Sequence, residues 1–234
     1  MLNICIIPAR GGSKRIPRKN IKDFLGKPII AYSIQAALQC NLFDEVMVST
    51  DDEEIVEIAK QYGAKVPFVR SKKNSDDYAG TVDVILEVLL EYEKQQISFE
   101  NICCLYPTAP FVTAELMEEG YHMLTQKNYN SVFPVCAFSF PILRALQLST
   151  EQQVSMIWPE NMAKRSQDLP PAYHDAGQFY WCRTTSLISE NKLYTNNSGA
   201  VILSELNVQD IDNESDWKLA ELKYKIQNED SNLN

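Results

Sequence analysis

Histidine is scarce in this chain, and several familiar catalytic motifs are missing from it. His122 and His174 are the only histidines, and no cluster of histidines and cysteines has the spacing of a zinc site. The serine nucleophile motif G-x-S-x-G is absent, as are the phosphate-binding motifs G-x-G-x-x-G and G-x-x-x-x-G-K-S/T. The sequence therefore gives no support to zinc chemistry or to serine-dependent hydrolysis. It also lacks the dinucleotide-binding fingerprint and the P-loop.

Paired cysteines and long hydrophobic runs are missing as well. The six cysteines form no C-x-x-C pair, and most lie in apolar runs such as LNICIIP and NICCLYP, so we expect reduced, buried thiols. No stretch approaches the ~20 apolar residues of a membrane span, and the N-terminus lacks the pattern of a signal peptide. We expect a cytoplasmic protein.

The charge of the chain is divided unevenly along its length. The net charge is −9, yet seven of the 22 basic residues and only one acidic residue fall within positions 1–27. An acidic protein repels nucleic acid and anionic membranes at long range, whereas a local basic cluster suits a small polyanion. We predict no nucleic-acid or membrane partner, and the alternative for the basic segment is a solvated surface.

Apolar, β-rich runs alternate with helical patterns through most of the chain. The predicted strands are residues 4–8, 45–50, 65–69, 101–106, 131–137, 178–183 and 200–203, and the predicted helices are 28–40, 53–62, 81–94, 113–126 and 215–226, with a short helix after residue 183. Strands that are apolar on both faces and separated by helices are typical of a parallel sheet covered on both sides. The predicted fold class is α/β, with a doubly wound, mainly parallel, Rossmann-like sheet.

The alternation stops at residues 138–173. This segment contains four prolines and has no long helical period, so we predict an arm inserted in a single domain of residues 1–234. Phe138, Phe140, Ile157 and Trp158 would expose apolar surface on such an arm. We therefore expect a homodimer joined through it.

The strongest motif follows the first predicted strand and reads PARGGSKR. Two adjacent glycines allow backbone amides to approach phosphate oxygens closely, and the flanking arginines and lysines supply positive charge. In an open α/β sheet, ligands bind outside the carboxyl ends of the strands, which is where this loop lies. The loop therefore predicts a cradle for a triphosphate.

The longer segment PARGGSKRIPRKNI resembles the signature of the CMP-sialic acid synthetase family of nucleotidyltransferases. The similarity continues through LGKPIIAYSI, VSTDDEEI, LYPTAPF and QDLPPAYHDAGQFYW. It implies an enzyme that joins CTP to an acidic nine-carbon sugar and releases pyrophosphate. The residues it assigns to CTP are Ala9, Arg10, Gly11, Ser13, Lys19, Asn20, Arg70, Ala79, Thr81, Tyr106 and Pro107. Tyr106 stands where many relatives have glutamine, which leaves open whether it contacts cytidine.

A second motif is Asp210-x-Asp212. Alternate residues of an extended segment project to the same side, so two carboxylates can converge on one hard cation, although a solvated acidic loop has the same pattern. The family resemblance implies that Asp210 and Asp212 hold Mg²⁺ against the nucleotide phosphates. Together with Arg10 and Lys19, Asp212 completes the predicted catalytic set.

Polar side chains are dense around two prolines in residues 165–178. The predicted sugar-binding residues are Arg165, Gln167, Asp168, His174, Asp175 and Gln178. An arginine matches a carboxylate, and the acceptors match hydroxyl and amide groups. Sialic acid enzymes usually read R-P-N-G where this chain reads HDAG, and HDAGQFYW resembles the pseudaminic acid branch of the family. Legionaminic, sialic and Kdo sugars remain the alternatives, as does a purely structural role for this loop.

Overall fold

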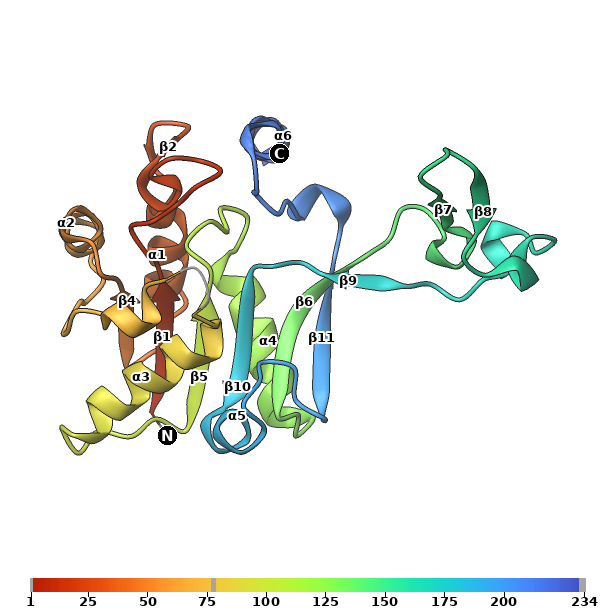
Figure 1. Cartoon of the computed structure of the whole chain (residues 1–234). Helices are drawn as coiled ribbons and strands as arrows, with labels where there is room; N and C mark the ends of the chain where they lie inside the picture. The colour runs from red at the N-terminus through yellow and green to blue at the C-terminus, as the bar shows by residue number, and fades with distance from the viewer. Residues whose placement is uncertain (1, 77–78, 232–234) are drawn as a thin grey trace.

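A computed structural model describes residues 2–76 and 79–231, which form a twisted central sheet with helices on both faces (Figure 1). In sheet order the strands are β11 (Ser198–Leu203), β6 (Ser131–Ala137), β10 (Phe179–Arg183), β5 (Asn101–Leu105), β1 (Asn3–Pro8) and β4 (Glu45–Ser49). β1 pairs in parallel with β4 and β5, and β6 with β11, while β10 runs antiparallel between β5 and β6. The prediction of a mainly parallel α/β sheet is confirmed.

Six α-helices accompany the sheet in the described part of the chain. They are α1 (Ile29–Gln39), α2 (Glu53–Gln61), α3 (Thr81–Glu93), α4 (Ala114–Gln126), α5 (Thr184–Glu190) and α6 (Glu214–Ser231). Side chains start two of them, because Asp52 accepts from the backbone N–H of Ile55 and Thr113 accepts from that of Leu116. The short 3-10 helices are η1 (Lys19–Ile21), η2 (Lys72–Asn74), η3 (Ile142–Arg144), η4 (Pro159–Asn161), η5 (Ser166–Asp168) and η6 (Glu205–Asn207).

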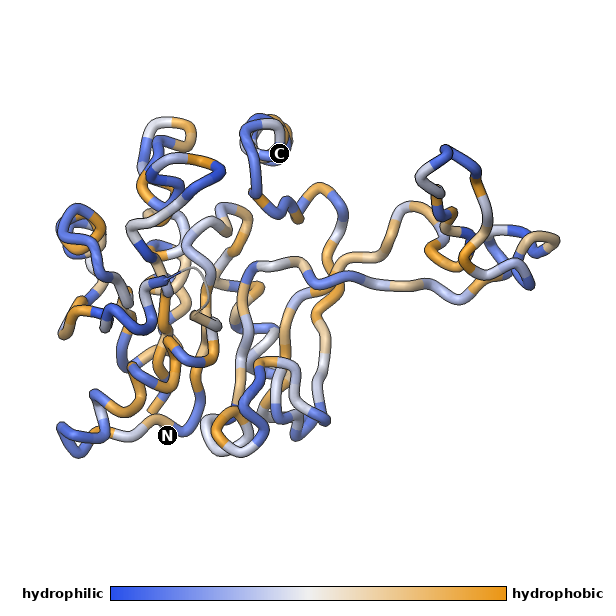
Figure 2. The backbone as a smooth tube through the Cα atoms, viewed as in Figure 1, coloured by the Kyte–Doolittle hydropathy of each residue, from blue (hydrophilic) through white to orange (hydrophobic). Residues whose placement is uncertain are grey.

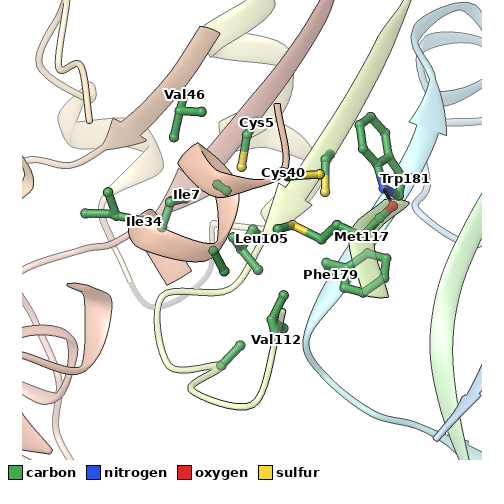
Figure 3. Packing of buried hydrophobic residues seen from close by; sticks show 14 of the residues in the cluster. Cys5, Ile7, Ile34, Cys40, Val46, Leu105, Val112, Met117, Phe179 and Trp181 are labelled. Atoms are coloured by element: carbon green, nitrogen blue, oxygen red, sulfur yellow. Dashed lines mark hydrogen bonds between the residues drawn. The ribbon is translucent and has the colours of Figure 1, made fainter. Parts of the chain in front are cut away.

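Separate hydrophobic clusters cover the two faces of the sheet. Alternate residues of β1 divide between them: Cys5 and Ile7 pack toward α1 and α4, whereas Ile4 and Ile6 pack toward α3. Figure 3 shows the first cluster, with Ile34 of α1 on the same side as Ile7. Burial on both faces explains why the strand sequence is apolar without alternation. The six cysteines are free and buried, as predicted.

Helix α4 approaches β10 closely at Gly120. A Cβ atom added at Gly120 would lie 3.0 Å from the ring of Phe179 and 3.1 Å from the ring of Trp181. Trp181 is fully buried, and its indole N–H donates to the carbonyl oxygen of Met117 at 3.0 Å (Figure 3). The missing side chain at Gly120 therefore sets the distance between this helix and the sheet.

The strand predicted at residues 65–69 is wrong. Lys65 alone forms a bridge to Met47, with its N–H bonded to the carbonyl oxygen of Val46 at 2.9 Å. Pro67 has no N–H to donate, so a ladder cannot continue past it along the edge of β4. The final helix also differs from expectation, because it continues beyond residue 226 to Ser231.

Residues 138–173 leave the sheet as an arm that projects far from the strands (Figure 1). The arm carries a small hairpin of β7 (Leu146–Leu148) and β8 (Val154–Met156). A second two-stranded sheet, β2 (Asp23–Phe24) with β3 (Lys27–Pro28), lies between β1 and α1 in the chain. At its base, β9 (Tyr173–Asp175) pairs antiparallel with the end of β6. The exposed apolar side chains of the arm, some of them in the hydrophobic segments seen in Figure 2, include Phe140, Leu146, Leu148, Val154 and Met162.

None of the helices in residues 2–76 and 79–231 combines the length and the apolar character that a membrane-spanning segment needs.

Candidate active site

A cleft of about 520 Å³ opens at the carboxyl ends of β1 and β5. Five cationic side chains line it: Arg10, Lys14, Arg15, Lys19 and Arg70. The predicted CTP residues among its lining are Arg10, Ser13, Lys19, Asn20, Arg70, Ala79, Thr81, Tyr106 and Pro107, and Asp212 lines it as well. The topology thus brings the first loop, the start of α3, the end of β5 and the segment before α6 to one place.

The first loop is clamped onto the turn between β4 and α2. The backbone N–H of Gly11 donates to Asp51 at 3.0 Å, and a Cβ on Gly11 would lie 2.6 Å from a carboxylate oxygen of Asp52. Arg18 binds both carboxylate oxygens of Asp52, at 2.5 and 2.8 Å, and also Glu54, and it lowers the pKa of Asp52. The Gly11 amide is therefore engaged within the protein, and neither Gly11 nor the fully buried Ala9 belongs to the cleft lining.

Lys19 and Asn20 tie the loop to other segments from within η1. The ammonium group of Lys19 donates to the carbonyl oxygen of Ile211 at 2.7 Å. The side-chain amide of Asn20 donates to the backbone carbonyl oxygen of Arg10 at 2.9 Å. Burial lowers the pKa of Lys19, while the carboxylates of Asp212 and Asp210 act in the opposite direction. Lys19 thus places a half-buried cation between the basic loop and the two aspartates.

The two aspartates occupy different environments. Asp212 forms an ion pair with Arg15 at 2.7 Å, and its backbone N–H donates to the carboxylate of Asp216 at 2.9 Å. Asp210 is exposed, and partial desolvation, followed by the charge of Asp212, raises its pKa. Among the described residues, no group of three or more histidine, cysteine, aspartate or glutamate side chains is placed to hold a metal. A cation held by Asp210 and Asp212 would therefore need further oxygen ligands from a substrate or from water.

Arg70 and Tyr106 line another part of the cleft. The guanidinium of Arg70 donates to the hydroxyl of Ser49 at 3.0 Å and to its carbonyl oxygen, and burial lowers the pKa of Arg70 to about 10, so it stays charged near neutral pH. Tyr106 is fixed by its backbone, since its N–H donates to the carbonyl oxygen of Gln178 at 2.8 Å and its carbonyl accepts from Ser33. The loop from Arg70 to Thr81 includes residues 77–78, which lie outside the described residues.

Comparison with known proteins places this site in a family. The chain matches the family described as cytidylyltransferase over residues 4–226. It belongs to the cytidylyltransferase family. It is 45% identical to pseudaminic acid cytidylyltransferase from Campylobacter jejuni over 229 residues, covering 98% of this chain and 99% of that protein. The predicted CTP-dependent nucleotidyltransferase class is thereby confirmed.

More distant relatives agree with this assignment. CMP-N,N'-diacetyllegionaminic acid synthase from Legionella pneumophila is 31% identical over 97% of both chains. In the fold comparison, CMP:2-keto-3-deoxy-manno-octonic acid synthetase, solved in complex with CTP, gives a TM-score of 0.69 at 19% identity. That structure covers 98% of this chain and is itself covered completely, which supports the fold of the cytidylyltransferase.

The predicted sugar residues of this cytidylyltransferase lie outside the lining of the cleft. Arg165, Gln167 and Asp168 lie in the arm around η5, where Arg165 pairs with Asp168 at 2.8 Å. His174 lies at the base of the arm, on β9, and its ring nitrogen Nδ1 is 2.9 Å from the carbonyl oxygen of the next residue. Gln178 is buried, and its side chain donates to the carbonyl oxygen of Asn207 at 2.7 Å.

Asp175 has three hydrogen-bond donors from its own chain. Tyr180 donates to its Oδ2 atom at 2.6 Å, Tyr194 donates to the same atom, and the N–H of Gly177 donates to Oδ1 at 2.9 Å. The two tyrosines had no place in the site expected from the sequence. Tyr180 lies in the HDAGQFYW segment that resembles the pseudaminic acid branch, so that resemblance was the available signal for it, whereas Tyr194 lies in a loop outside the quoted motifs.

The cleft lining also contains residues that the sequence did not single out as ligands. They include Asn74, Asp76 and Thr108. Thr108 lies in the LYPTAPF segment that resembles the family, so that resemblance was the available signal for it, whereas Asn74 and Asp76 lie outside the segments quoted above.

Proposed function

We propose that this cytidylyltransferase transfers CMP from CTP to the anomeric hydroxyl of pseudaminic acid and releases pyrophosphate. The observation that carries this proposal is the cleft at the carboxyl ends of β1 and β5, which five cationic side chains line together with Asp212. The choice of pseudaminic acid rests on the similarity to the Campylobacter jejuni enzyme along almost the whole chain. Legionaminic acid is the second candidate, because of the Legionella relative; sialic acid and Kdo follow it.

The proposed reaction asks the protein mainly for alignment and for neutralisation of charge. The hydroxyl oxygen of the sugar forms a bond to the α-phosphorus, the bond from that phosphorus to the bridging oxygen breaks, and the hydroxyl proton is released to solvent. Arg10 and Lys19 line the cleft where they offset the charge of the triphosphate and of the leaving pyrophosphate. Arg70 and Asn20 would hold the nucleotide in one orientation, which lowers the entropic part of the barrier.

Asp210 and Asp212 are the residues that would hold a magnesium ion. Partial desolvation and then the charge of Asp212 raise the pKa of Asp210, and a cation shared by the two carboxylates would offset the repulsion between them. Carboxylate and phosphate oxygens are the ligands that Mg²⁺ prefers. The ion would supply neutralisation of phosphate charge next to Lys19, and Arg15 would have to exchange its ion pair with Asp212 for a phosphate.

We further propose a homodimer in which the arm of each subunit contributes to the cleft of the other. Arg165, Gln167 and Asp168 project with the arm away from their own sheet (Figure 1), so a partner's cleft is the place where they would meet a substrate carboxylate. Phe140 is 82% exposed, and Leu148 and Met162 are 65% exposed, which is a large apolar surface for an isolated subunit.

The buried, free cysteines also suit the reducing cytoplasm, which is the location we propose.

The test is a panel of acceptors with the purified protein. CTP and Mg²⁺ are incubated with pseudaminic, legionaminic and N-acetylneuraminic acids and with Kdo, while pyrophosphate release is followed and the CMP-sugar is identified by mass. We expect efficient turnover with pseudaminic acid and CTP, and little with ATP, GTP or UTP. Preferred use of legionaminic acid would select the second candidate. Release from none of the four acids would contradict the proposed function.

A further inference from the structure

A tyrosine–carboxylate cluster, defined here as Tyr106, Tyr180, Asp175 and Tyr194, connects the wall of the cleft with the base of the arm. Tyr106 lines the cleft, and Tyr180 lies beside it on β10 with the ring centroids 5.4 Å apart. Tyr180 is only 3% exposed, and its hydroxyl donates to Asp175 at 2.6 Å. The cluster thus runs without a break from a substrate-facing ring to a carboxylate outside the cleft lining.

Asp175 is held in this cluster by its own chain. A carboxylate offers about four lone-pair positions, and three are engaged by Tyr180, Tyr194 and the N–H of Gly177. Hydrogen bonds to an ionised carboxylate are about twice as strong as neutral ones. The geometry therefore suits an internal anchor better than a side chain waiting for a sugar amide, which is the role expected from the sequence.

The side chain of Tyr180 contacts both Asp175 and Tyr106. Its hydroxyl has a single proton, and it donates that proton to Asp175. Its ring packs against the ring of Tyr106 at an interplanar angle of 58°. Because Tyr106 lines the cleft, this packing orients the ring and the hydroxyl that Tyr106 presents there.

We propose that Asp175 is a positioning residue, which acts through Tyr180 to fix the orientation of Tyr106 and thereby the ring and hydroxyl that Tyr106 presents to the substrate. This inference rests on the proposed transfer to an acidic sugar. It also assigns a structural route from the arm to the cleft, because Asp175 pairs with Val135 in the β6–β9 ladder at the base of the arm. Asp175 itself would make no contact with the sugar.

A double-mutant cycle separates this role from direct binding. Asp175→Asn and Tyr106→Phe are compared singly and together by kcat and KM for the sugar acid and for CTP. We expect each single change to lower kcat/KM for the sugar about tenfold, and the double variant to be no worse than about the weaker single one. Multiplied losses, about 100-fold in the double variant, would mean independent contacts and would overturn the inference. Tyr121→Phe on the opposite face of the sheet is the matched control, expected to retain activity.

A second measurement does not depend on turnover. 3-Fluorotyrosine is placed at position 106, and its ¹⁹F resonance is recorded without substrate in the wild-type background and with Asp175→Asn. We expect the resonance to move, and to move similarly with Tyr180→Phe, which keeps the ring and serves if the asparagine variant fails to fold. An unchanged resonance would refute the positioning role even in an active enzyme. A shifted resonance in a protein inactive on every acid would support the positioning role and refute the proposed function instead.

Discussion

The side chain of Arg10 is oriented by a neutral backbone group. One of its guanidinium N–H groups donates to the carbonyl oxygen of Asp76 at 2.9 Å, which orients the side chain at the cleft without cancelling its charge through that bond. We therefore expect Arg10→Ala to lower turnover on the order of 10²-fold, because one preorganised cation for the phosphates is lost. Steady-state kinetics and a thermal melt check this. Lys60→Ala on α2 is the control, and a fall in melting temperature with unchanged turnover would contradict the prediction.

Asp210 and Asp212 carry the second prediction at this scale. Replacing either with alanine removes half of the carboxylate pair that would hold the cation, so activity in Mg²⁺ should fall by at least about 100-fold. The reaction rates of wild type and both variants are measured at increasing Mg²⁺ concentration. Chelation of the metal with EDTA should abolish the activity of the wild type. Glu57→Ala on α2 should change nothing. Full activity of both aspartate variants in Mg²⁺ would exclude them as the metal site.

The sequence brings the residues of the basic loop together, but it does not predict the partners of Asp175 in the fold. Arg10, Lys19 and Asn20 follow one strand within a short segment, so a single turn carries them to the same cleft. Asp175 meets partners from β10 and from the loop before β11, and these contacts exist only after the sheet has formed. No local pattern distinguishes a carboxylate that two tyrosines will anchor from one that will bind a ligand.

The contact of α4 with β10 carries a prediction at the element scale. Phe179 and Trp181 are fully buried, so neither ring has room to yield to a methyl group at Gly120. Gly120→Ala should destabilise the protein by about 1–3 kcal/mol through overpacking, despite the better helix propensity of alanine. Denaturant unfolding measures this. Gly12→Ala, where an added Cβ meets nothing within 4 Å, is the matched control and should unfold at the wild-type midpoint.

The predicted and observed elements differ where a local rule competes with the hydrophobic pattern. The run at 65–69 is apolar enough for a strand, but Pro67 removes the N–H that pairing requires. Pro134, in contrast, lies inside β6 at the point where the antiparallel neighbour changes from β10 to β9. The direction of β10 was also beyond prediction, because a strand buried on both faces has the same composition in either direction.

At the scale of the whole molecule, the arm projects from the sheet and exposes apolar side chains. This surface leads to a prediction about how the subunits assemble. Wild type should sediment as a dimer at assay concentration. Introducing charge with Leu146→Asp and Leu148→Asp together should shift it toward the monomer and lower turnover, because each cleft would lose the partner's arm. Leu90→Asp on α3, an exposed leucine far from the arm in sequence, is the control. A fully active wild-type monomer would contradict the shared site.

The ladder between β6 and β9 has a consequence for how such a molecule can change over evolutionary time. Ala137 and Tyr173 face each other across it, and the N–H of Phe138 donates to the carbonyl oxygen of Ala172 at 3.0 Å, so the excursion enters and leaves the sheet at one point. Insertions, deletions and exchanges between these two positions leave the registers of β6 and β10 untouched. The arm can therefore be lengthened, shortened or exchanged by recombination while the sheet and the cleft at its carboxyl edge are inherited intact.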